Sequence, residues 1–150
     1  ERFSFDEGRL VAFFEMLPRT RSQAATLARR HDHRLRAQPH VSFESDGPIR
    51  HAIEIRSESF RDPRFINLLR RHDIALVCAD TPRWPLLMDV TDDFVYCRLH
   101  GSTELYNSRY TDDELDRWAA RIRAWSTGAR RAPAAGSTVP AARGAGPGWK

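Results

Sequence analysis

The sequence predicts an α/β protein with a parallel sheet, and three observations favour that class. Residues 49–56, 74–80 and 94–101 each have the apolar content and two-residue alternation of a β-strand. A helical pattern lies between the first two segments, and a second one follows the third. Parallel neighbours need a long crossover, usually through a helix, so this order predicts strands that run in the same direction.

The helix between the first two strands has a defined start. Asp62 is suited to cap a helix, and Pro63 occupies the first helical position. Phe65, Leu68 and Leu69 then follow with helical spacing. The spacing therefore predicts a strand, a helix and a second strand in succession.

A further helix is predicted after the third strand. Thr111 and Glu114 have the spacing of a capping box, and the helix ends at Gly128. Its apolar face is formed by Leu115, Trp118, Ala119, Ile122 and Trp125. Between residues 80 and 94, two prolines and the lack of periodicity predict a loop with one short turn.

Two helices are predicted ahead of the strands. The first is capped by Asp6, has Leu10, Phe13 and Phe14 on one face, and is ended by Pro18. The second covers residues 21–35, with a thin apolar stripe opposite many arginines. Residues 36–48 are predicted to be loop.

Charge is unevenly distributed along the chain. The net charge is +4 and the isoelectric point is about 9.7, which by itself favours a nucleic-acid partner. Residues 128–150 hold four basic residues and no carboxylate, so residues 1–127 carry 20 basic and 20 acidic groups and are formally neutral. Nucleic acid is therefore only weakly supported as a partner.

Residues 128–150 are rich in Ala, Gly, Pro and Arg, and are predicted to be a disordered tail. Nearly every basic residue of the chain is arginine, which suggests GC-rich coding. A shifted frame in such DNA yields this composition, so we interpret the tail as frame-shifted or truncated, with an authentic disordered tail as the alternative.

The rest of the chain indicates a soluble protein. Glu1 is not methionine, and neither a signal peptide nor a run of ~20 apolar residues is found. We expect a cytoplasmic fragment without membrane contact. Cys78 and Cys97 lie in apolar strand interiors without Cys-x-x-Cys spacing, so buried thiols are favoured over a disulfide or a zinc site.

Polar side chains gather near the carboxyl ends of the three strands. They are Glu54 and Arg56 on the first strand, Asp80 on the second, and Tyr96, Arg98 and His100 on the third. Alternation places Glu54 with Arg56, and Arg98 with His100, on shared faces. Because parallel strands present their carboxyl ends at one edge, the charged groups and His100 are expected to converge on one opening.

These residue types favour an anionic ligand. Glu54, Asp80 and His100 are permissible metal ligands, but Arg56 and Arg98 in the same opening disfavour a cation, so no metal is predicted. Phosphate or carboxylate is the simpler ligand, bound by Arg56, Arg98 and Tyr96. His100, Glu54 and Asp80 are the candidate proton carriers. No cofactor is indicated.

Each candidate also has a purely structural interpretation. Glu54, Arg56, Asp80 and Arg98 could form a buried ion network, and His100 could hold a loop by a hydrogen bond. The aromatic side chains of Trp84, Tyr106 and Tyr110 could stack on a sugar or base, although loop packing is favoured. The arginines and histidines of residues 29–36 could meet phosphates, but a solvated helix face is favoured.

The strand motifs resemble a known family. The segments His51-Ala-Ile-Glu-Ile-Arg56, Ser59-Phe60, Ala79-Asp80 and Tyr96-Cys-Arg-Leu-His-Gly101, with Tyr106 and Tyr110 beyond, resemble the domain-of-unknown-function 72, or YecE-like, family over residues 3–127. The resemblance implies a TIM-type (β/α) barrel. Residues 1–127 would then be its second-half fragment, with parallel strands five to seven and flanking helices. No activity is implied, and a relation to endonuclease-IV-like barrels is a fold-level analogy.

Three functional hypotheses remain open. The barrel could be an enzyme, such as a hydrolase, that acts on a phosphate ester or sugar-like ligand. It could instead bind nucleic acid or a metabolite without turnover. As a truncated chain, it could also be non-functional, with exposed edges at strands five and seven that pair with another chain. Substrate and oligomeric state are not predicted.

Overall fold

The computed structural model of the chain describes residues 3–101 and 110–127. Tyr106 and the predicted tail, residues 128–150, lie outside the described residues. The chain forms two compact units. One unit is Gly8–Arg50, and the other combines Glu1–Glu7 with His51–Lys150.

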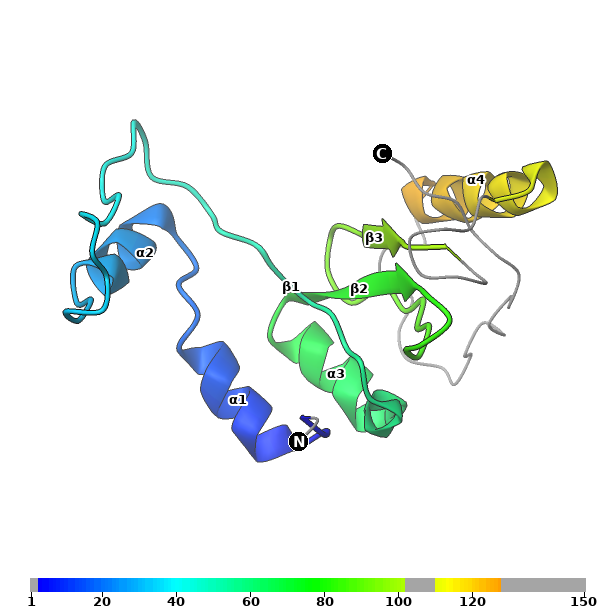
Figure 1. Ribbon diagram of the computed structural model, residues 1–150, viewed down its shortest axis with the longest axis horizontal. Helices are drawn as coiled ribbons and strands as arrows, with labels where there is room; N and C mark the ends of the chain where they lie inside the picture. The colour runs from blue at the N-terminus through cyan, green and yellow to red at the C-terminus, as the bar shows by residue number, and fades with distance from the viewer. Residues whose placement is uncertain (1–2, 102–109, 128–150) are drawn as a thin grey trace. The chain divides into compact units, whose positions relative to one another are not determined.

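The second of these units contains a three-stranded parallel sheet (Figure 1). Strands β1 (His51–Ile53), β2 (Ile74–Asp80) and β3 (Tyr96–Leu99) lie in the order β1-β2-β3, and both neighbouring pairs are parallel. The predicted α/β class and the common strand direction are confirmed. Strands β1 and β3 are shorter than predicted because only three and four of their residues pair with β2.

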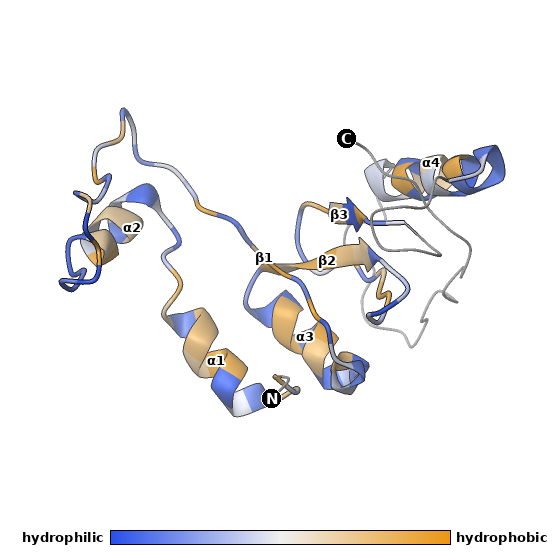
Figure 2. Ribbon diagram, viewed as in Figure 1, coloured by the Kyte–Doolittle hydropathy of each residue, from blue (hydrophilic) through white to orange (hydrophobic). Residues whose placement is uncertain are grey.

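The central strand β2 is the core of this unit. All seven of its residues are buried, which is typical of a parallel strand covered on both faces. Its apolar character is visible in Figure 2. Strand β3 pairs with β2 only from Val77 onward. Before Val77, Thr91 bonds to the backbone of β2 in place of a strand. The buried Thr91 hydroxyl donates to the Ile74 carbonyl at 2.7 Å and accepts from the Leu76 N–H at 2.8 Å. As predicted, residues 81–93 contain no helix or strand, but residues 94 and 95, which were predicted to begin the third strand, are not part of it either.

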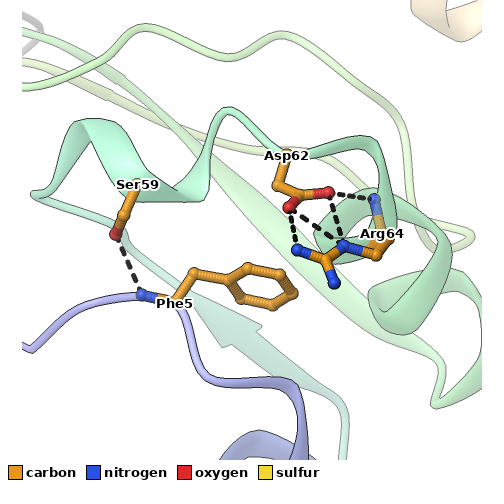
Figure 3. A network of polar contacts seen from close by, with 4 residues as sticks. All are labelled: Phe5, Ser59, Asp62 and Arg64. Carbon is orange, nitrogen blue, oxygen red and sulfur yellow. Dashed lines mark hydrogen bonds and ion pairs between the residues drawn. The ribbon is translucent and has the colours of Figure 1, made fainter.

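Helix α3 (Pro63–Arg71) connects β1 to β2 as predicted. The Asp62 carboxylate accepts from the Arg64 backbone N–H at 2.9 Å and also pairs with the Arg64 guanidinium (Figure 3). Phe65, Leu68 and Leu69 are completely buried. A short 3₁₀ turn, η1 (Glu58–Phe60), precedes the helix and was not predicted. Beside this turn, the Phe5 N–H donates to the Ser59 hydroxyl at 2.9 Å.

Helix α4 (Asp112–Ser126) begins with the predicted capping box, in which the Thr111 N–H donates to Glu114 at 2.6 Å. Of its predicted apolar face, only Trp118 is fully buried, and Trp125 is partly buried beside it. Trp118 forms a buried cluster with Cys78 and Tyr110, and Cys97, Leu99 and Trp125 pack against this cluster. Leu115 and Ile122 are exposed, so this face is narrower than predicted.

The unit Gly8–Arg50 has little buried apolar surface. Helix α1 (Glu7–Glu15) buries Leu10 and Phe14, and helix α2 (Arg21–Ala28) buries only Ala25. Thr20 caps α2 by accepting from the Gln23 N–H at 3.2 Å. Among the helices of residues 3–101 and 110–127, none is long and apolar enough to cross a membrane.

The prediction that the second helix reaches residue 35 was wrong, because α2 ends at Ala28. The six residues that follow Ala28 include no large apolar side chain, so a longer helix would bury nothing. Instead, the Asp32 carboxylate accepts from the Arg34 N–H at 2.9 Å, a local bond that competes with helix formation.

Candidate functional site

One carboxylate lies at the centre of the predicted site. Glu54 follows β1, and its side chain is only 13% exposed. Its Oε1 accepts from Nε of Arg56 at 3.0 Å, and Nη2 of the same guanidinium lies 2.9 Å away. Its Oε2 accepts from Nη1 of Arg98. Each oxygen of Glu54 thus holds one guanidinium, and the three groups carry a formal charge of +1.

The Glu54–Arg98 pair spans the central strand. Arg98 of β3 is in register with Ala79 of β2, while Glu54 extends β1, on the other side of β2. Neighbouring strands are about 4.8 Å apart, so the two backbones are separated by about twice that distance. Two long side chains are needed to bridge it, and the small side chain of Ala79 leaves them room. The predicted proximity of Glu54, Arg56 and Arg98 is confirmed.

The side chain of Trp84 lies beside that of Arg56. It lies in the loop after β2, and its ring centre is 4.0 Å from Cζ of Arg56, which is a cation–π contact. The His100 ring meets Trp84 edge-on, with 6.1 Å between ring centres and an interplanar angle of 82°. The sequence analysis favoured plain loop packing for Trp84. Its contact with Arg56 depends on the path of the loop, which no local pattern predicts.

His100 follows β3 and is held to the end of β2. Its backbone N–H donates to the Asp80 carbonyl at 3.0 Å. Burial lowers the pKa of the His100 side chain, and the positive charge of Arg98 lowers it further, while Glu54 acts in the opposite direction. The neutral imidazole is therefore favoured at neutral pH.

Asp80 does not join the ion pairs. It is in register with Leu99, so alternation puts its side chain on the face opposite Arg98. There it accepts a hydrogen bond from the Tyr110 hydroxyl at 2.8 Å. The expected convergence of Asp80 with Glu54 and Arg98 was wrong. The apolar neighbour Cys78, on the same face of β2, is the signal in the sequence that marks this as the interior side.

Burial is the main influence on the pKa values of Asp80 and Tyr110. It raises the pKa of the Asp80 carboxyl, although hydrogen bonds from Tyr110 and Trp118 partly offset the effect. Burial and the neighbouring Asp80 also raise the pKa of the Tyr110 phenol. The pair has the character of a structural contact beneath α4.

Tyr96 is the remaining predicted site residue, and the two cysteines lie on the neighbouring strands β2 and β3. Tyr96 begins β3, two residues before Arg98 on the same face, and is 49% exposed. Cys78 and Cys97 are in register on neighbouring strands and are free thiols; Cys78 is buried as predicted, whereas Cys97 is only half-buried. A hydrogen bond with Cys97 and burial raise the pKa of the Cys78 thiol. Within the described ranges, no three His, Cys, Asp or Glu side chains are grouped to hold a metal ion.

The chain matches a known protein family. The model of a family described as protein of unknown function DUF72 matches residues 1–139, which confirms the resemblance seen in the strand motifs. No curated protein and no solved structure matches the chain.

The raised pKa of Asp80 predicts a pH-dependent effect of Asp80→Asn. The folded state retains the Asp80 proton at pH values where the unfolded chain, with a pKa near 3.8, has released it. Ionisation of Asp80 therefore lowers the stability of the wild type as pH rises through that window, and the amide variant escapes this loss. We expect the free energy of unfolding of the variant, relative to wild type, to increase between pH 4 and pH 7. Urea denaturation at both pH values measures it; a constant or falling difference would contradict the burial of this carboxyl.

Proposed function

This chain belongs to the DUF72 family, whose function is unknown, and we propose that it is part of a TIM-type (β/α) barrel that binds a small phosphate-bearing ligand. Three parallel strands in sequential order support the barrel assignment as strands five to seven. In such barrels, binding residues lie at the carboxyl ends of the strands. Glu54, Arg56, Arg98 and His100 all lie at or just beyond those ends.

The observation that carries this proposal is the sharing of one carboxylate by two arginines. Glu54 neutralises one of the two positive charges and orients both guanidinium groups. The Arg56 side chain remains 59% exposed and the Arg98 side chain 36% exposed. A guanidinium offers five N–H donors, so each retains donors for a phosphate or sugar-phosphate oxygen. Tyr96, on the same face, lies beside Arg98 as a further contact for the ligand.

The same geometry divides the roles of the acidic groups. Both oxygens of Glu54 are occupied by guanidinium groups, which suits it to positioning the arginines rather than to moving protons. Asp80 supports the site indirectly, because its carbonyl holds the backbone of His100. His100, with its lowered pKa, is the group suited to carry a proton.

Hydrolysis of a phosphate ester is the reaction that His100 would serve. Binding without turnover, of a metabolite or a nucleic acid, is the second candidate. The occupied oxygens of Glu54 and the placement of Asp80 on the opposite face favour this second candidate. Both candidates require the same arginines.

We expect Arg98→Gln and Arg56→Gln each to weaken the binding of phosphate or glucose 6-phosphate by about tenfold or more, since each removes a charge-assisted donor. Isothermal titration calorimetry of the full chain measures the affinity. Arg123→Gln, in the last turn of α4, is the matched control and should bind like wild type. Circular dichroism checks that each variant is folded. If wild type binds neither probe, or if all three variants bind equally, the proposed site is wrong.

A substitution at His100 separates catalysis from binding. If the site catalyses hydrolysis, His100→Ala abolishes the release of phosphate from p-nitrophenyl phosphate and changes phosphate affinity by less than about threefold, since the arginines provide the affinity. Release is followed by absorbance and affinity by calorimetry. If wild type binds phosphate but releases none from the ester, hydrolysis is rejected and binding alone remains.

A further inference from the structure

The formal neutrality of residues 1–127 conceals a separation of charge between Gly8–Arg50 and the other residues of that range. Gly8–Arg50 holds eight arginines and four carboxylates, and so carries a charge of +4. The rest of residues 1–127 holds twelve arginines and sixteen carboxylates, and so carries −4. The positive charge therefore belongs to one compact unit. A polyanion that meets this unit is attracted even though residues 1–127 as a whole are neutral.

Within that unit the charge is concentrated just after α2. Residues 29–36 contain four arginines and one aspartate. The sequence pattern favoured a solvated helix face for these residues, but α2 ends at Ala28 and the following residues form no helix. Every residue from 29 to 38 is exposed. The arginines are thus presented together on an irregular segment rather than spread around a helix.

These arginines are weakly neutralised. Arg34 lies 3.8 Å from Asp32, and the two side chains are 84% and 59% exposed, so the pair contributes little. In the part of the chain that the structure describes, Arg29, Arg30 and Arg36 form no ion pair. Their guanidinium groups are available to an external anion. Several arginines within eight residues match a row of closely spaced phosphates better than a single phosphate.

An open groove along α2 continues this surface. It has a volume of about 290 Å³ and is lined by Ser22, Gln23, Thr26, Leu27 and Arg30. The Gln23 side-chain oxygen accepts from the Arg19 N–H, which leaves the amide NH₂ as a donor. Leu27 is 52% exposed and gives the groove an apolar side. Polar donors beside an apolar side chain suit a nucleotide, which has a charged backbone and an apolar base face.

We propose that residues 29–36 and the groove along α2 bind the phosphodiester backbone of a single-stranded nucleic acid. The segment is not helical, so it lacks the element that usually reads the major groove of a duplex. In the sequence, His31 and His33 lie between Arg30 and Arg34, and their exposed rings can stack on unpaired bases. An anionic membrane fits less well, because surface binding needs an amphipathic helix and this segment has Leu35 as its single large apolar residue.

The test is the salt dependence of binding to a fluorescein-labelled 20-nucleotide DNA single strand, measured by anisotropy with the full chain. Each phosphate contact that is lost should make the slope of log K against log salt less steep by about 0.7. The triple variant Arg29→Gln, Arg30→Gln, Arg36→Gln should therefore bind more weakly, with a slope smaller by about 2. This comparison also cancels any contribution from the basic residues beyond position 127.

The control variant is Arg61→Gln, Arg117→Gln, Arg123→Gln, which removes the same charge from exposed positions outside Gly8–Arg50. It should keep the wild-type slope. The proposal is overturned if wild type does not bind the strand at 50 mM salt, or if the two triple variants have equal slopes. It is also overturned if the first triple variant loses binding to phosphatidylserine vesicles but keeps wild-type binding to the DNA strand. Retained affinity of the first triple variant for inorganic phosphate shows that the Arg56–Arg98 site is intact, so the two proposals fail separately.

Discussion

The ion pairs of Glu54 are the interaction on which the candidate site depends. This single carboxylate binds Arg56, two residues further along the same chain segment, and Arg98, two strands away. The contact is possible because β1 and β3 both run parallel to β2 and present their carboxyl ends at one edge. The carboxylate therefore joins the two outer strands and fixes two cationic groups that would otherwise repel each other.

The sheet separates this charged face from an apolar one by simple alternation. Ala79 and Arg98 share one face, whereas Cys78, Asp80 and Leu99 share the other, against which α4 packs. The Asp80 carboxylate, on the apolar face, accepts a hydrogen bond from the Tyr110 hydroxyl. The face with Cys78 and Asp80 thus packs against α4, and the face with Ala79 and Arg98 holds the groups that can bind a ligand.

Local patterns in the sequence were sufficient for the elements and for part of the site. The Asp62–Pro63 start and the Thr111–Glu114 capping box predicted α3 and α4, because capping is decided within a few residues. Alternation along one strand likewise placed Glu54 beside Arg56. The failures involve contacts between distant segments. Alternation puts Asp80 on the same face as Cys78, but whether that face is the packed one depends on where α4 lies. The approach of Trp84 to Arg56 depends on the path of a loop. The early end of α2 reflects a lack of buried surface that spacing alone did not show.

A double-mutant cycle between Glu54 and Arg98 tests the central claim most directly. The free energies of unfolding of wild type, Glu54→Gln, Arg98→Gln and the double variant are measured by urea denaturation at pH 7. If Glu54 holds Arg98 across β2, the double variant loses less stability than the sum of the single variants, with a coupling energy of about 1 kcal/mol or more. Additive effects, within about 0.3 kcal/mol, would show that the two side chains do not interact and would contradict the account.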